Sequence, residues 1–98
     1  MNTYVILRRS GWRTPEALEE AAKRSLRVGD EQMADEIRWI RSYALAEAGG
    51  TVGTVCVYQA TSEDAVRRHA AGADLPVDEV IHVADTVVVR PDPAGVAS

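Results

Sequence analysis

Short stretches rich in β-branched and aromatic residues alternate along the chain with longer stretches in which apolar residues recur at helical spacing. The strand-like stretches are "TYVILRR", "IRWIRSYALAE", "VGTVCVYQA" and "EVIHVADTVVVR", whose composition and partial alternation are typical of strands. The helical stretches are "RTPEALEEAAKRSLRVGD" and the residues that follow "QATS". The pattern predicts the order strand, helix, strand, strand, helix, strand.

The first predicted helix has signals at both ends. Thr14 is a suitable N-cap residue and Pro15 suits the first helical turn, whereas Gly29 provides a stop near the other end. The polar stretch "DEQMADE" is then expected to connect this helix to the next strand. One stripe of residues is predicted to face the core: Leu18, Ala21, Ala22, Ser25 and Leu26.

The second half of the chain has its own boundaries. "AGGT" predicts a tight turn between two paired strands, because glycine adopts positive φ angles easily. Thr61 or Ser62 caps the second helix, and Gly72 lies near its end. The last stretch is expected to be one long strand, or two short ones broken near Ala84 and Asp85.

This order predicts an α+β fold of the ferredoxin-like split βαβ type, β-α-β-β-α-β, with two helices on one face of an antiparallel sheet. The 98 residues suit one domain. We expect that domain to cover residues 1–90. Residues 91–98 are expected to form a flexible tail, because the prolines in "PDPAGVAS" lack backbone donors for a sheet.

Helices on one face leave the other face of the sheet open. Because such a face is too apolar to leave in water, we expect a second copy to cover it, as in a homodimeric α/β barrel. A cleft between the two sheets for a small organic ligand, with Arg41, Tyr43 and His82 around it, is the alternative, and it would suit a binding protein or an enzyme. Strand alternation predicts the following residues on this face: Tyr4, Trp39, Arg41, Tyr43, Cys56, Tyr58 and His82.

Composition narrows the possible partners. The net charge is −4, which disfavours nucleic acid, and the Arg pairs at 8–9 and 67–68 are interpreted as solvated surface. No apolar run is long enough to cross a membrane, and no signal peptide is evident at the start. We therefore expect a cytoplasmic protein without nucleic-acid or membrane partners.

Candidate chemistry rests on one cysteine and two histidines. A single cysteine excludes an intrachain disulfide, and Cys56 is interpreted as a packed strand residue rather than a nucleophile. His69 is predicted on the inner stripe of the second helix, on the opposite side of the sheet from Cys56. His82 on the open face is the better candidate for a metal ligand or general base. No motif assigns a catalytic residue, so a binding protein is favoured over an enzyme.

Several stretches resemble a known family. "WIRSY", "CVYQA", "AVRRHAAGADLPVDEVIHV" and the opening "YVILRR" are similar to the small bacterial nickel-responsive, nickel-binding proteins. The resemblance implies a ferredoxin-like homodimer that binds Ni(II), or another divalent metal, in sequestration or detoxification. Ni(II) prefers imidazole and mixed nitrogen and oxygen ligands. His82 and His69 are therefore the candidate metal ligands.

Overall fold

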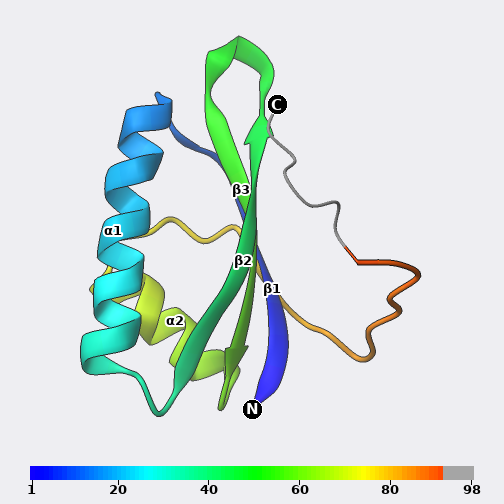
Figure 1. Ribbon diagram of the computed structural model, residues 1–98. Helices are drawn as coiled ribbons and strands as arrows, with labels where there is room; N and C mark the ends of the chain where they lie inside the picture. Colours follow the sequence, from blue (N-terminus) through cyan, green and yellow to red (C-terminus); the bar gives the residue numbers. More distant parts are fainter. Residues whose placement is uncertain (92–98) are drawn as a thin grey trace.

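The predicted order of elements is confirmed by a computed structural model, which describes residues 1–91 (Figure 1). The elements are β1 (Asn2–Trp12), α1 (Pro15–Gln32), β2 (Ile37–Ala46), β3 (Val52–Ala60), α2 (Glu63–Gly72) and β4 (Glu79–His82). A short 3-10 turn, Ala48–Gly50, joins β2 to β3. The four strands form one antiparallel sheet in the order β2-β3-β1-β4, so the α+β, ferredoxin-like fold class is also confirmed.

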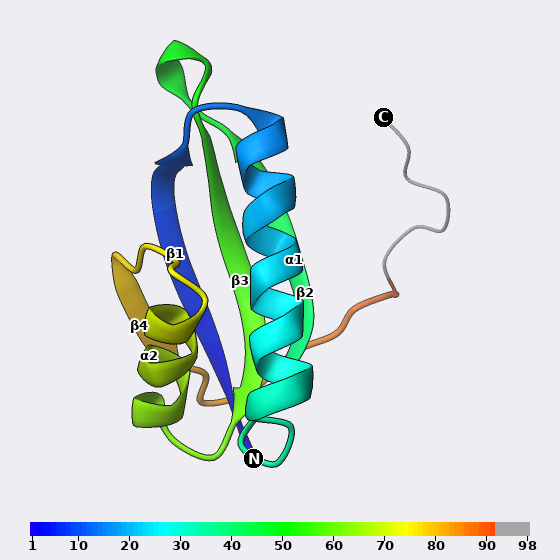
Figure 2. The ribbon, with the colours of Figure 1, turned by 90° about the vertical axis from the view of Figure 1, so that its left-hand side faces the viewer.

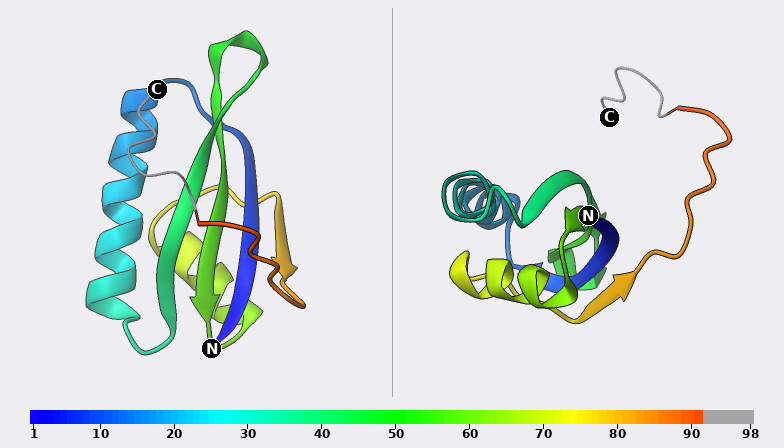
Figure 3. Two further views of the ribbon diagram at one scale, coloured as in Figure 1. Left: turned by 45° about the vertical axis from the view of Figure 1, so that its right-hand side comes forward. Right: turned by 90° about the horizontal axis from the view of Figure 1, so that it is seen from below.

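Both helices lie on the same face of the sheet, with α1 over β2 and β3 and α2 over the lower part of β1 and β4 (Figure 2). Residues 83–91, which follow β4, lie on the opposite side of the sheet (Figure 3). The sheet therefore has one face covered by helices and one face without them, as the element order predicts. We call these the helix face and the open face. Among residues 1–91, no helix is both long and apolar enough to cross a membrane.

The helices begin where the sequence predicts, and α1 ends later. Thr14 accepts a hydrogen bond from the backbone N–H of Ala17 at 3.1 Å, and Ser62 caps α2 in the same way. Helix α1 continues through Gly29 to Gln32, so the predicted stop is wrong. Glycine costs only about 1 kcal/mol inside a helix, which the packing of the following turn against the rest of the domain can offset.

The turn between β2 and β3 is confirmed. Gly49 and Gly50 have φ angles of 80° and 82°, the left-handed region that glycine reaches without steric cost. The carboxylate of Glu47 accepts hydrogen bonds from the backbone N–H of Ser10 and the guanidinium of Arg9. These contacts lower the pKa of Glu47 and join the hairpin to β1.

Strand β4 is shorter than predicted. Its last residue, His82, pairs with Tyr4 on β1, and the backbone N–H of Val83 still donates to the carbonyl of Thr3 at 2.9 Å. Strand β1 begins at Asn2, so residues 84–91 have passed the end of the neighbouring strand and do not pair with it. The run "TVVVR" is consequently not a strand, and of the predicted tail over 91–98 only Pro91 lies within the described residues.

The two faces of β1 and β3 are reversed relative to the prediction. Tyr4, Cys56 and Tyr58 are buried on the helix face, whereas Val5 and Val57 are half-buried on the open face. The physical reason lies in α1, which presents small side chains to the sheet at the positions where the sheet presents large ones. Small residues on the helix give the large side chains of the sheet room between the two layers.

A bulge divides the residues of β2 between the two faces. The register of β2 against β3 shifts between Trp39 and Arg41, which leaves Ile40 as an extra residue. Trp39 stacks on Tyr58 with ring centroids 6.1 Å apart, so its predicted position on the open face is wrong. Arg41 and Tyr43 follow the bulge and line the open face, as predicted. A bulge reverses the facing of every residue after it, and nothing in the residue pattern shows where it falls.

Candidate functional site

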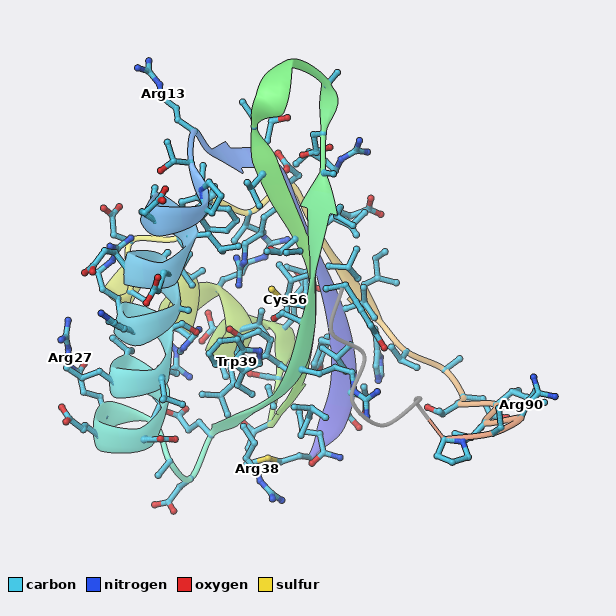
Figure 4. The ribbon with its side chains drawn as sticks, turned by 45° about the horizontal axis from the view of Figure 1, so that its top comes forward. Arg13, Arg27, Arg38, Trp39, Cys56 and Arg90 are labelled. Atoms are coloured by element: carbon cyan, nitrogen blue, oxygen red, sulfur yellow. The ribbon has the colours of Figure 1, made fainter. Side chains whose placement is uncertain are left out.

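A cavity of about 190 Å³ lies between α1 and the helix face of the sheet. We call it the α1 cavity. Figure 4 shows Trp39 and Cys56 in the space between α1 and the sheet. Its walls are mostly apolar, with hydroxyl groups and one guanidinium among them. The cavity is lined by Arg8, Trp12, Leu18, Ala21, Ala22, Ser25, Trp39, Ser42, Ala44, Thr54, Cys56, Tyr58 and Leu75.

Arg8 is the charged group of this wall, and its interpretation as solvated surface is wrong. The side chain is only 1% exposed, and its Nη1 donates to the carbonyl of Pro76 at 2.7 Å. Within residues 1–91, no carboxylate forms an ion pair with it. The alternation of β1 could have located Arg8 in the sequence, because Arg8 lies two residues after Ile6 and four after Tyr4, on the same face of the strand.

Tyr58, Ser25 and His69 form a buried polar group beside the cavity. The hydroxyls of Ser25 and Tyr58 lie 2.7 Å apart, and His69 Nε2 donates to the carbonyl of Ser25 at 2.9 Å. The His69 ring contacts Tyr58 with centroids 5.3 Å apart. Burial raises the pKa of Tyr58 and lowers the pKa of His69, because burial disfavours the charged form of each group.

Cys56 lies on the same side of the sheet as His69, contrary to the prediction that the sheet separates them. Its thiol donates to the hydroxyl of Thr54 at 3.3 Å. In the part of the chain that the structure describes, no hydrogen bond joins Cys56 to His69. The residue is 5% exposed and packs in the buried cluster, as the interpretation of Cys56 as a packed strand residue expects.

His82 is exposed at the end of β4. It pairs with Tyr4, so it lies on the helix side of the sheet rather than on the predicted open face. Its ring stacks on Tyr4 with centroids 5.1 Å apart and the planes inclined by 25°. Of the two histidines, His82 is therefore the accessible one, whereas His69 is buried and uses its Nε2 inside the protein.

The described residues contain no preformed set of side chains that could bind a metal ion. Within residues 1–91, no three His, Cys, Asp or Glu side chains cluster at the spacing that a metal ion needs. Asp78 and Glu79 precede His82 closely in the chain, but the carboxylate of Asp78 instead accepts a hydrogen bond from the backbone N–H of Arg9. A metal ion bound at His82 would need further ligands from outside this set.

The open face is an apolar surface beside an exposed segment. Ile40, Tyr43 and Ile81 are among the exposed large apolar side chains, and Val87–Val89 extend alongside them with exposures between 73% and 84%. A wide groove separates this face from residues 86–91. Surfaces of this kind on a small domain mark sites of association.

Comparisons with known proteins agree with this fold. A ferredoxin-like sheet with two helices on one face defines the class of the domain. A crystal structure of SCO4226 from Streptomyces coelicolor A3(2) is similar, with a TM-score of 0.66 and 20% sequence identity over 87% of this chain and 99% of that chain. No curated protein is significantly similar in sequence.

The family model described as "Nickel responsive protein SCO4226-like" matches residues 4–83. Because this match covers most of the chain, the protein belongs to the SCO4226-like nickel-responsive family, which confirms the resemblance found in the sequence. The matched range includes both histidines and the lone cysteine.

The buried His69 makes the stability of the fold sensitive to acid. Its pKa is below 6.5 in the folded state, chiefly because of burial, with the charge of Arg8 acting in the same direction. The unfolded chain therefore binds the proton more readily, so the free energy of unfolding is highest above about pH 6.5 and falls as the pH drops below it. One proton changes it by at most about 1.4 kcal/mol per pH unit. Urea unfolding across this range should show the slope.

The histidine variants separate this effect from the general acid sensitivity of a protein. His69→Gln keeps a donor for the Ser25 carbonyl but does not titrate, so its unfolding free energy should fall less steeply. His82→Gln, which removes an exposed imidazole, is the matched variant whose slope is compared with that of His69→Gln. Equal slopes for His69→Gln and the wild type would contradict the assignment.

Proposed function

We propose that this protein is a cytoplasmic Ni(II)-binding protein that acts as a homodimer, with His82 as the nitrogen ligand. The family match over residues 4–83 carries the proposal. A protein of this kind sequesters the ion by binding it, and the ion is its cargo rather than a cofactor. The same imidazole would also accept another divalent metal that prefers nitrogen and oxygen ligands.

Accessibility favours His82 over His69 as the ligand. The ring of His82 lies exposed at the edge of the sheet and is held on one side by Tyr4. His69 is buried, and its Nε2 is bonded to the Ser25 carbonyl, so binding a metal there would break a buried hydrogen bond and open the contact between the helices. The proposed site is therefore the exposed edge at β4.

A single imidazole does not fill the coordination sphere of Ni(II). Because the described residues hold no cluster of three ligands, the remaining positions would be filled by water, by carboxylates near β4 or by a second copy. The proposed homodimer would supply the last of these. Its support is the apolar open face, where half-buried Val5, Val55 and Val57 lie beside exposed Ile81.

Calorimetric titration of Ni(II) into the protein without a histidine tag tests the proposal. We expect saturable binding by the wild type. Mutations in the second shell of a metal site cost about 10-fold to 100-fold in affinity, so the loss of a ligand in His82→Ala should cost at least about 100-fold. His69→Gln is the matched control and should bind like the wild type.

Two results would contradict the nickel proposal. One is the absence of any heat or Ni(II)-dependent signal with the wild type, and the other is full affinity in His82→Ala. If His69→Gln alone lost binding while its circular dichroism spectrum stayed native, the ligand would be His69 instead. The metal content of tag-free protein would show independently which ion the cell supplies.

A further inference from the structure

We propose that the α1 cavity binds a small organic monocarboxylate, with the guanidinium of Arg8 as the receptor for the carboxylate group. This inference concerns a site on the helix face and does not depend on nickel binding. Nothing in the family match assigns a ligand to this part of the protein. It also differs from the small-molecule cleft predicted from the sequence, which was placed on the open face.

The charge of Arg8 is the first observation. An arginine side chain remains protonated in proteins, and burying a charge is unfavourable unless it is paired and hydrogen-bonded. Arg8 is almost fully buried and donates to the neutral carbonyl of Pro76. Among residues 1–91, it has no carboxylate partner. A bound anion would supply the missing negative charge.

The geometry of the cavity wall is the second observation. Thr54 is the register partner of Arg8 on β3, and its hydroxyl accepts the Cys56 thiol, so its own hydrogen remains to donate. The opposite wall is apolar and comes from Leu18 and Ala22 on α1. One charged end, one hydroxyl donor and an otherwise apolar body match a carboxylate attached to a hydrocarbon group.

The volume limits the size of the ligand. The cavity holds about 190 Å³, and an apolar protein cavity of about 150 Å³ is large enough for benzene. The α1 cavity therefore has room for one ring with a carboxylate, or for a short aliphatic acid of similar bulk. Nucleotides are too large for it, and sugars carry more hydroxyl groups than its mostly apolar walls can pair. Benzoate, phenylacetate and hexanoate are suitable probes.

Titration of metal-free, ¹⁵N-labelled protein with these three acids tests the inference by NMR. We expect saturable shifts of amide signals on both walls, at Ala21 and Ala22 of α1 and at Thr54 and Cys56 of β3. Benzyl alcohol has the ring without the charge and should bind about 10-fold or more weakly, because a hydrogen bond to a charged group is worth more than a neutral one. EDTA in the buffer keeps the test independent of Ni(II).

Two variants of the cavity wall and one control variant locate the binding. Ala22→Leu fills the cavity and leaves the Arg8 side chain unchanged, so it should abolish the saturable shifts, whereas Ala71→Leu on the exposed side of α2 should bind like the wild type. Arg8→Leu should remove the preference for benzoate over benzyl alcohol. If Arg8→Leu does not fold, Ala22→Leu still tests whether the acids bind in the cavity. Equal affinity of the wild type for benzoate and benzyl alcohol would overturn the proposal. So would wild-type binding by Ala22→Leu, or the absence of saturable shifts with all three acids at millimolar concentrations.

Discussion

Ile6→Ala should lower the free energy of unfolding by about 2–5 kcal/mol, the range for truncating a fully buried aliphatic side chain. Ile6 is 0% exposed in the middle of β1, the strand that pairs with both β3 and β4. It packs in the buried cluster with Tyr58 and Val66. Its removal leaves a cavity that the paired strands cannot close, and urea unfolding at fixed protein concentration measures the loss.

A matched change on the helix surface provides the control. Leu26 was predicted to face the core, but it is 50% exposed on α1. Leu26→Ala should therefore change the free energy of unfolding by no more than about 0.5 kcal/mol. If both variants lost similar stability, the position of the core between the sheet and the two helices would be wrong.

Val5→Glu should convert the proposed homodimer into a monomer. Val5 lies on the open face between Val57 and Ile81, its register partners on the two neighbouring strands. In a monomer the new carboxylate would reach water, so the fold should persist. In the dimer it would be buried against apolar side chains, at a cost of several kcal/mol for an unpaired charge. Analytical ultracentrifugation gives the mass of each form.

Ala71→Glu adds the same charge on the exposed side of α2, away from the open face. This control should keep the wild-type mass. A monomeric wild type at micromolar concentration would contradict the dimer proposal directly. Val5→Glu with the mass of the wild type would show that association uses another surface. Titration of both variants with Ni(II) would then show whether metal binding requires the second copy.

Local signals in the sequence account for much of the fold. The cap residues Thr14 and Ser62 act on neighbouring N–H groups, and Gly49 and Gly50 satisfy a turn that needs positive φ angles. Each of these effects involves only a few adjacent residues, so each can be predicted from the residue order. The end of α1 was missed because the cost of Gly29 within the helix is small.

The facing of the strands could not be predicted in the same way. Alternation divides each strand into two sets of residues, and both sets here contain enough apolar residues to be the inner one. The choice depends on the opposite layer, where Ala21, Ala22 and Ser25 leave space for Tyr58 and the other large side chains. That complementarity is a property of two packed layers and is absent from either segment alone.

The candidate sites follow from the same distinction. The sequence alone determined the order of the elements, the family, and the choice of His69 and His82 as candidate metal ligands. These depend on local propensity and on residue identity. Only the tertiary structure decided that His82 is accessible and His69 is not, and that Arg8 is buried against a cavity. Burial depends on which segments pack together across the sheet, and neighbouring residues in the chain do not specify it.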